Sequence, residues 1–370
     1  MEENVRNISV DIKHRAYILY WNEQNTEYLT PNTVLLSIFL LIGLPGNLAI
    51  TFVYQFRLNK KTDGRYFIVP LAWIDTAALL ITGAFNLTQN SKSVMFSRFG
   101  ACKLLTYLCY VLTCISLYLL IIIAIQRYLK ICKPFGRQMN LVWKRRSISI
   151  CALASAILFI PVLFYYGQVE IRNPKLGNVT GYQCNKLPGS TINLTLLRIY
   201  QGFGVVGSIG NVITVTVLYI LVTKAIIRQT SKMKIVETKV ENVSVTTSCT
   251  VEKKTTTRST EAQDIHPTKP APRNTAYRIS FMFMTISIVG FLAYLPSWIF
   301  ILIETNNPEF WKNLPYVSFH IRLTLRRMYM VNHLCNPFIY GVFDREEVRK
   351  LWKKGIRVVL QFRVLRDPKI

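Results

Sequence analysis

The chain has few charged residues for its length and few of the residues that build enzyme sites. Charged residues make up 17% of its 370 residues, against roughly 25% in an average globular protein. It contains four histidines, and neither a zinc-type spacing of cysteine and histidine nor a glycine-rich phosphate loop is present. These shortages argue against an ordinary soluble enzyme, a disordered chain and a disulfide-dense secreted domain. We therefore expect no enzymatic activity.

Apolar sequence, in contrast, is abundant. Hydrophobic residues make up 51% of the chain, and a helix needs about 20 apolar residues to cross about 30 Å of hydrocarbon. Seven runs are long enough, and they cover residues 33–56, 66–86, 100–125, 147–167, 195–227, 277–303 and 314–341. The sequence therefore predicts an all-α membrane protein, with a seven-transmembrane helix bundle over residues 33–343. A polar N-terminal segment (1–32) precedes the bundle and a tail (344–370) follows it.

The charges are distributed unevenly over the two sides that such a bundle would have. If residues 1–32 lie outside, the inner loops and the tail hold 31 of the 45 Lys and Arg residues and 10 of the 19 acids. Their net charge is then +21, whereas the outer segments carry +6 and one acid, Asp75, lies within a span. This positive-inside pattern predicts a multi-pass plasma-membrane protein with an extracellular N-terminus. It also assigns the total charge of +26 to contact with membrane lipids rather than to nucleic acid.

Polar residues inside membrane spans cost free energy and usually mark function. Here they occur in a fixed order along the predicted spans: Gly46-Asn47, Asp75, Cys102, Ser116, Gln126-Arg127-Tyr128, Tyr219, Tyr294-Leu295-Pro296, Asn332 and Asn336-Pro337-Phe338-Ile339-Tyr340. This order and spacing resembles the rhodopsin-like (class A) family of G-protein-coupled receptors over roughly residues 33–356. The resemblance implies a cell-surface receptor that activates heterotrimeric G proteins when its sixth helix moves outward.

The resemblance also implies an ion site around the buried acid. Five residues resemble the polar cluster that holds a sodium ion in the family, namely Asn47, Asp75, Ser116, Asn332 and Asn336. A lone carboxylate in a dry bundle needs a cation or a proton, and hydroxyl and amide oxygens can complete the coordination of a metal ion. A water-filled hydrogen-bond network around a protonated Asp75 is the alternative. No other cofactor is expected.

Eight residues resemble the family's coupling and activation residues: Gln126, Arg127, Tyr128, Tyr219, Tyr294, Pro296, Pro337 and Tyr340. Arg127 resembles the arginine that meets the G protein, and Tyr219 and Tyr340 resemble the tyrosines that stabilise the open state. The family usually has an acid where this chain has Gln126, which would weaken the resting state and raise basal signalling. The alternative is that Gln126 donates its own hydrogen bond and nothing changes. Gly290 and Tyr294 also depart from the family, which usually has phenylalanine and tryptophan there.

Cys102 and Cys184 resemble the family disulfide that joins the third span to the second outer loop. Both lie on the predicted oxidising side of the membrane. Three Asn-x-Ser/Thr triplets on the same side, at Asn7, Asn178 and Asn193, are candidate glycosylation sites.

The ligand side departs from the amine receptors of the family. These have an aspartate where this chain has Cys109, which argues against a cationic amine ligand. Glu170, Glu304, Arg322 and Arg326 place charges of both signs around the predicted mouth and resemble the peptide-binding branch. We therefore predict a neuropeptide ligand, with the alternative that these arginines pair with acids of the chain or with lipid headgroups.

Three other functions stay open from the sequence alone. A small anionic metabolite could bind the outer arginines, and a decoy receptor could bind a ligand without G-protein coupling. An ion transporter or channel would use the polar cluster as a path, but the chain has neither an internal repeat nor paired broken helices.

The inner side carries two further predictions. Residues 228–275 are rich in Ser, Thr, Lys and Pro, which predicts a mostly disordered third inner loop where receptor kinases and arrestin would act. From residue 344 the tail predicts a short amphipathic helix at the membrane interface, which resembles the family's eighth helix.

Overall fold

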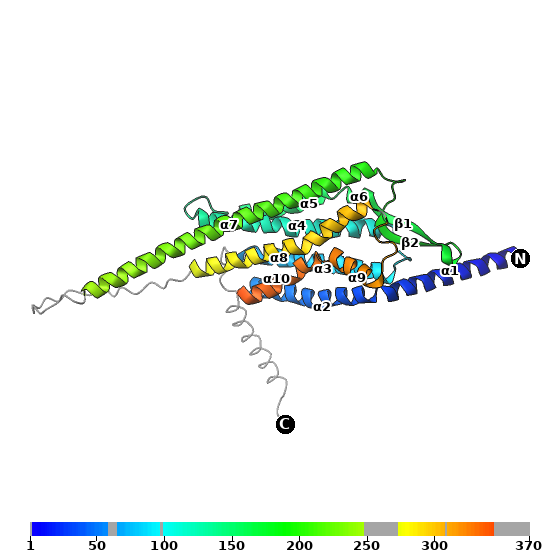
Figure 1. Ribbon diagram of the computed structural model, residues 1–370, viewed down its shortest axis with the longest axis horizontal. Helices are drawn as coiled ribbons and strands as arrows, with labels where there is room; N and C mark the ends of the chain where they lie inside the picture. Colours follow the sequence, from blue (N-terminus) through cyan, green and yellow to red (C-terminus); the bar gives the residue numbers. More distant parts are fainter. Residues whose placement is uncertain (1, 58–64, 97–98, 248–272, 308, 344–370) are drawn as a thin grey trace, which may run out of the picture.

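The computed structural model describes residues 2–57, 65–96, 99–247, 273–307 and 309–343. Most of these residues lie in long helices that run side by side along the longest axis of the molecule (Figure 1). Helices satisfy every backbone hydrogen bond within one segment, which is why apolar runs of this length fold as helices in a membrane. The all-α bundle predicted from the sequence is therefore confirmed.

Six of the helices in the described residues are long and apolar enough to cross a membrane. They are α2 (Thr30–Phe52, extended by a π-helical turn, Val53–Arg57), α3 (Ile68–Ser91), α4 (Phe99–Cys132), α5 (Leu141–Leu158, extended by α6, Val162–Tyr165), α7 (Leu194–Thr247) and α8 (Arg273–Asn306). The α4 helix lies centrally, in contact with α3, α5, α7 and α8. The main hydrophobic core consequently forms around its inward face.

The seventh predicted span differs from the single helix expected over 314–341. It consists of two helices, α9 (Tyr316–Arg326) and α10 (Met330–Phe343), joined by a turn at residues 327–329. The helix breaks at two adjacent arginines that bond to different neighbours. Arg326 is bonded to α8, whereas Arg327 is bonded to α2 and α3. The two guanidinium groups thereby reach polar partners on three different helices at the cost of helical continuity.

A two-stranded antiparallel hairpin caps one end of the bundle. It is formed by β1 (Tyr166–Asn173) and β2 (Val179–Lys186), paired from Tyr166 with Lys186 to Asn173 with Val179. The sequence did not predict these strands. We call this end of the bundle the hairpin end, and the opposite end, where Arg127 lies near the end of α4, the Arg127 end.

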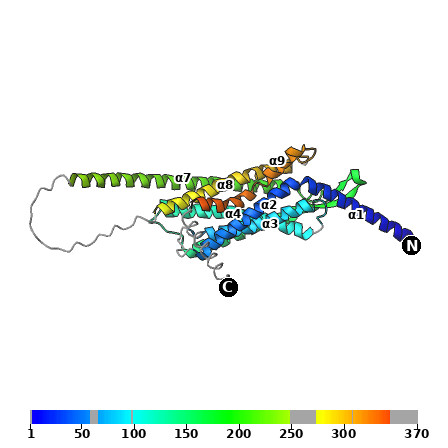
Figure 2. The same ribbon diagram turned by 90° about the horizontal axis from the view of Figure 1, so that it is seen from below.

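Two helices extend beyond the bundle, one at each end (Figure 2). At the hairpin end, α1 (Glu2–Tyr28) precedes α2. At the other end, α7 continues to Thr247 and so includes residues 228–247, the first part of the segment for which the sequence predicts disorder. That stretch contains neither proline nor glycine to end the helix that begins in the span. Residues 248–272 and the predicted tail helix from residue 344 lie outside the described residues.

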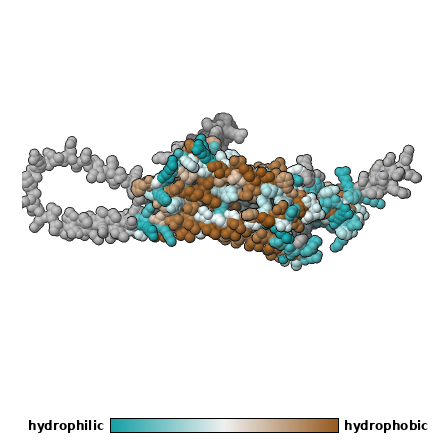
Figure 3. Space-filling view, turned by 90° about the horizontal axis from the view of Figure 1, so that it is seen from above, coloured by the Kyte–Doolittle hydropathy of each residue, from teal (hydrophilic) through white to brown (hydrophobic). Residues whose placement is uncertain are grey.

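The surface matches a membrane environment. Hydrophobic residues form a broad band around the middle of the bundle, and hydrophilic residues gather toward its two ends (Figure 3). Large apolar side chains such as Leu41, Ile150 and Phe203 are more than 60% exposed, as expected where lipid takes the place of water.

Candidate functional site

A polar cluster at the centre of the bundle surrounds Asp75 of α3, whose side chain is fully buried. Ser116 of α4 donates a hydrogen bond to Asp75 Oδ1 over 3.0 Å. His333 Nδ1 of α10 lies 2.7 Å from the same oxygen, and Asn336 Nδ2 donates to Oδ2. The carboxylate is therefore held from two helices by three side-chain donors.

The hydrogen bonds continue outward from Asp75. The Tyr294 hydroxyl lies 3.3 Å from His333 Nε2 and accepts a 3.3 Å hydrogen bond from Asn332 Nδ2. Asn332 Nδ2 also donates to Ser116 Oγ, and Asn47 Nδ2 donates to the carbonyl oxygen of His333 over 2.8 Å. The structure thus brings together all five residues predicted for the sodium cluster and adds His333 and Tyr294. That this polar cluster holds a sodium ion stays a prediction.

Sequence reasoning missed His333 as a member of this cluster. Its position offered a signal, because it precedes Asn336 by three residues and therefore shares a helix face with it. It is 1% exposed, so its ring is as deeply buried as the groups that it contacts.

Gly290 of α8 explains one departure from the family pattern. A Cβ atom at this position would lie 2.5 Å from Asn332 Oδ1, closer than atoms can approach. The glycine therefore lets the Asn332 amide pack directly against the backbone of α8, where a bulky aromatic residue would exclude it.

At the Arg127 end, the guanidinium of Arg127 is buried, with 1% of the residue exposed. Arg127 Nη2 donates to Gln126 Oε1 over 3.3 Å, and the guanidinium lies 5.2 Å from the centre of the Phe283 ring of α8. Gln126 therefore accepts a hydrogen bond from the arginine, and the effect of this residue on basal signalling stays a prediction.

The predicted activation tyrosines lie in the core close to this end. Tyr219 of α7 and Tyr340 of α10 are both buried in the hydrophobic cluster that also contains Phe283. Tyr128 is only partly buried, and the Lys133 amine lies 5.9 Å from its ring centre. The predicted kink residues Pro296 and Pro337 lie inside α8 and α10.

The predicted disulfide is confirmed at the hairpin end. Cys102 at the start of α4 is bonded to Cys184 of β2, with their Cα atoms 5.5 Å apart. Cys109, a predicted pocket residue, packs against the small hydrophobic cluster that contains Phe85, Phe96 and Cys102. The bond thus fixes the hairpin to the central helix.

The predicted ligand residues are divided between two places. Arg326 Nε lies 2.6 Å from Glu304 Oε1, and Trp311 Nε1 donates to the same oxygen over 3.0 Å. Arg322 donates to the Phe310 carbonyl oxygen over 3.0 Å and stacks on the Phe310 ring. The Arg326–Glu304 pair is the closest ion pair between two membrane-spanning segments in the described residues.

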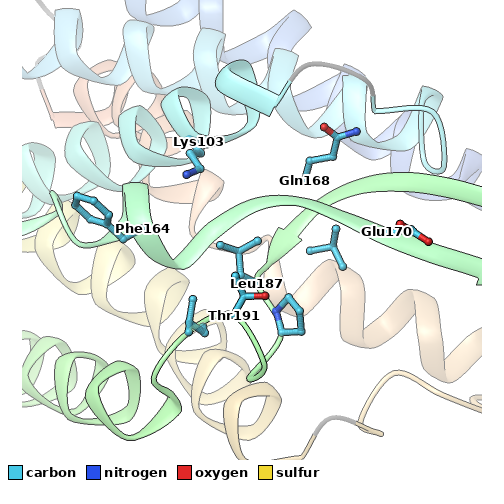
Figure 4. Close-up of a pocket in the computed structure, with 9 residues that line it drawn as sticks. Lys103, Phe164, Gln168, Glu170, Leu187 and Thr191 are labelled. Carbon is cyan, nitrogen blue, oxygen red and sulfur yellow. The ribbon is translucent and has the colours of Figure 1, made fainter.

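Glu170 lies apart from that pair, on the exposed hairpin, where it is bonded to Arg172 over 3.0 Å. It lines a pocket between the hairpin and the start of α4, together with Lys103, Gln168 and Thr191 (Figure 4). Two predicted glycosylation residues, Asn178 and Asn193, are also exposed at this end, whereas Asn7 belongs to α1.

Arg327 is a buried cation beside the partly exposed Arg326. It is 6% exposed and donates to Asn32 of α2 and to Asn90 Oδ1 of α3, the latter over 3.2 and 3.3 Å. Both partners are neutral amide oxygens.

Comparison with known proteins identifies similar chains. The family model described as 7 transmembrane receptor (rhodopsin family) matches residues 46–340. Leukotriene B4 receptor 1 of Mus musculus is 32% identical over 134 residues, which are 36% of this chain and 38% of that receptor. The tachykinin-like peptides receptor 99D of Drosophila melanogaster is 27% identical over 176 residues, or 46% of this chain and 33% of that receptor. Nematocin receptor 2 of Caenorhabditis elegans is 24% identical over 322 residues, or 84% and 76%.

Proposed function

Because the chain belongs to the rhodopsin family of seven-transmembrane receptors, we propose that it is a cell-surface receptor that binds an extracellular peptide and activates heterotrimeric G proteins. The observation that carries the proposal is the burial of Arg127 beneath Phe283 of α8. An arginine at this depth is covered by a ring from the helix that moves in the proposed activation. It becomes accessible to a partner when that helix swings outward.

The described contacts support this movement as the switch. Phe283 belongs to α8, and its ring lies 5.2 Å from the Arg127 guanidinium of α4. Outward movement of α8 would remove the ring and leave the guanidinium, with Tyr219 and Tyr340 nearby, facing the Arg127 end. The cost of exposing the arginine is moderate, because a guanidinium is well solvated by water.

A peptide ligand is supported by the hairpin end. Arg326 and Glu304 form an ion pair whose side chains are 35% and 19% exposed, so both charges can be reached from the mouth. A peptide carries groups of both signs and could exchange partners with such a pair. Two of the similar chains are named as receptors for peptides, tachykinin-like peptides and nematocin.

A small anionic ligand is the second candidate. Arg327 is a buried cation whose described hydrogen-bond partners are amide oxygens, which leaves its positive charge without a carboxylate among the described residues. A negatively charged ligand near this end would be attracted by that charge. Other similar chains are receptors named for leukotriene B4 rather than for a peptide.

The test is a screen for an activating ligand. Cells expressing the chain, with a promiscuous G protein, are exposed to a peptide library and, in parallel, to a library of small carboxylates and lipids. We expect a peptide to evoke a G-protein signal that is lost in Arg127→Ala at equal surface display. A response only to the small anions would favour the second candidate. Ligand binding that GTP analogues do not change would indicate a decoy receptor, and a ligand-evoked current would indicate a channel.

Regulation by receptor kinases and arrestin is proposed for the segment that follows α7. Serine and threonine cluster at the last residues of α7 and just after it, at Thr246, Thr247, Ser248, Thr255, Thr256, Thr257, Ser259 and Thr260, whereas the tail after Tyr340 has neither residue. Alanine at all eight positions is expected to abolish ligand-induced arrestin recruitment while G-protein activation persists. Unchanged recruitment would contradict this assignment.

A further inference from the structure

The hydrogen bonds around Asp75 do not fit a sodium ion. Hard cations are held by oxygen atoms whose lone pairs point at the metal. Here both carboxylate oxygens face donors instead: Oδ1 contacts Ser116 Oγ and His333 Nδ1, and Oδ2 contacts Asn336 Nδ2. A carboxylate accepts hydrogen bonds, so each of these three groups directs a hydrogen at it. Three of the about four lone pairs of the carboxylate are therefore already used.

The neighbouring amides are oriented in the same way. Asn332 directs its Nδ2 at Ser116 Oγ and the Tyr294 hydroxyl, while its Oδ1 packs against Gly290 of α8. Asn47 uses its Nδ2 to bond the carbonyl oxygens of Gly43 and His333. Asn47 and Asn332 therefore direct their donors, and not their side-chain oxygens, at the groups around Asp75, and those oxygens have no hydrogen-bond partner among the described residues.

We propose that the His333 side chain takes the place of the sodium ion at Asp75. Its Nδ1 lies 2.7 Å from Asp75 Oδ1, and its Nε2 lies 3.3 Å from the Tyr294 hydroxyl. One ring of α10 thereby joins α3 to α8, which is the connection that an ion with oxygen ligands would otherwise provide. The ring is 1% exposed and is covalently part of the chain, so it does not exchange with the medium.

This inference concerns the core and goes beyond the proposed function. It needs neither a ligand nor a G protein, so its failure would be distinct from a failure to find an activating peptide. It makes the stability of the receptor independent of sodium, and it identifies His333 as the residue that causes this independence.

The test measures thermal unfolding of the purified full-length chain in detergent. The melting temperature is compared in sodium chloride and in N-methyl-D-glucamine chloride at equal ionic strength, with potassium chloride as a further control. The wild type is expected to melt at the same temperature in all three salts. In His333→Ser, which supplies a hydroxyl oxygen and opens space beside Asp75, sodium is expected to raise the melting temperature by about 2–4 °C.

Matched variants show whether the ion binds at this site. The sodium effect in His333→Ser is expected to disappear when Asp75→Asn is added, because the site then lacks its negative charge. His333→Thr serves as a second replacement if the serine variant cannot be purified. A sodium-dependent rise in the wild type that Asp75→Asn removes would overturn the proposal. Sodium-independent melting of a folded His333→Ser or His333→Thr variant would also overturn it, because His333 would then not be what excludes the ion.

Discussion

The two ends of the bundle hold their arginines in different ways. At the hairpin end, Arg326 is paired with the carboxylate of Glu304, and the neighbouring hairpin is fixed by the Cys102–Cys184 disulfide. At the Arg127 end, the arginine contacts the amide oxygen of Gln126 and the ring of Phe283. In the proposed function, a ligand would therefore exchange partners with an ion pair, whereas a partner at the other end would need only the displacement of an aromatic ring. The hairpin end is built to hold its shape and the Arg127 end to change it.

Removal of Arg127 is expected to have the largest effect. Arg127→Ala should reduce G-protein activation to background, at least about tenfold, because the group that the movement of α8 uncovers is absent. The measurement is ligand-evoked G-protein activation at matched surface display. Arg137→Ala, which removes an exposed arginine of the same end, is the control and should signal normally. Equal loss in both variants would mean that general positive charge, rather than Arg127, is what matters.

The disulfide is expected to have the next largest effect, on stability. Cys184→Ser should lower the free energy of unfolding by about 2–5 kcal/mol, because the bond closes a long loop and ties the hairpin to α4. Thermal unfolding of the purified protein and the amount at the cell surface both report it. Cys151→Ser, a free and half-buried cysteine, is the control. If the two variants unfold alike, the hairpin end is not fixed by its covalent bond.

The ion pair at the mouth is expected to have an intermediate effect, on ligand potency. Arg326→Ala should weaken ligand potency about tenfold, which corresponds to about 1.4 kcal/mol. Arg322→Ala is the matched control, because Arg322 bonds to a backbone carbonyl oxygen and an aromatic ring rather than to Glu304. Dose–response curves at equal surface display measure both. Unchanged potency in Arg326→Ala would show that the pair only stabilises the bundle.

The smallest effect is expected at Gln126. Gln126→Glu should lower basal signalling by about two- to fivefold, because a charged acceptor strengthens the hydrogen bond that holds Arg127 in place. In this variant Arg127 would be paired with a carboxylate, as Arg326 is paired with Glu304 at the hairpin end. Basal G-protein activation without ligand measures the effect. The same basal activity in wild type and variant would indicate that the amide of Gln126 already holds Arg127 as firmly as a carboxylate.

Hydrophobicity and residue order predicted most of the bundle from the sequence. The spans, the polar cluster and the disulfide depend on patterns that each segment carries alone or on the family resemblance. The turn between α9 and α10 could not be predicted, because it depends on Asn32, Asn90 and Glu304, which lie far from Arg326 and Arg327 in sequence. The contact between His333 and Asp75 was missed for another reason, because the cluster was predicted from five residues that match the family and His333 is not among them.

The absence of a side chain at Gly290 affects two further positions, Asn332 and His333. The amide of Asn332 occupies the space that a Cβ atom would need, and His333 follows it on the same helix. A mutation to any larger residue at 290 would displace Asn332 and disturb the histidine beside Asp75. Where receptors of the family have phenylalanine at this position, the asparagine that corresponds to Asn332 must therefore lie differently from Asn332 in this chain.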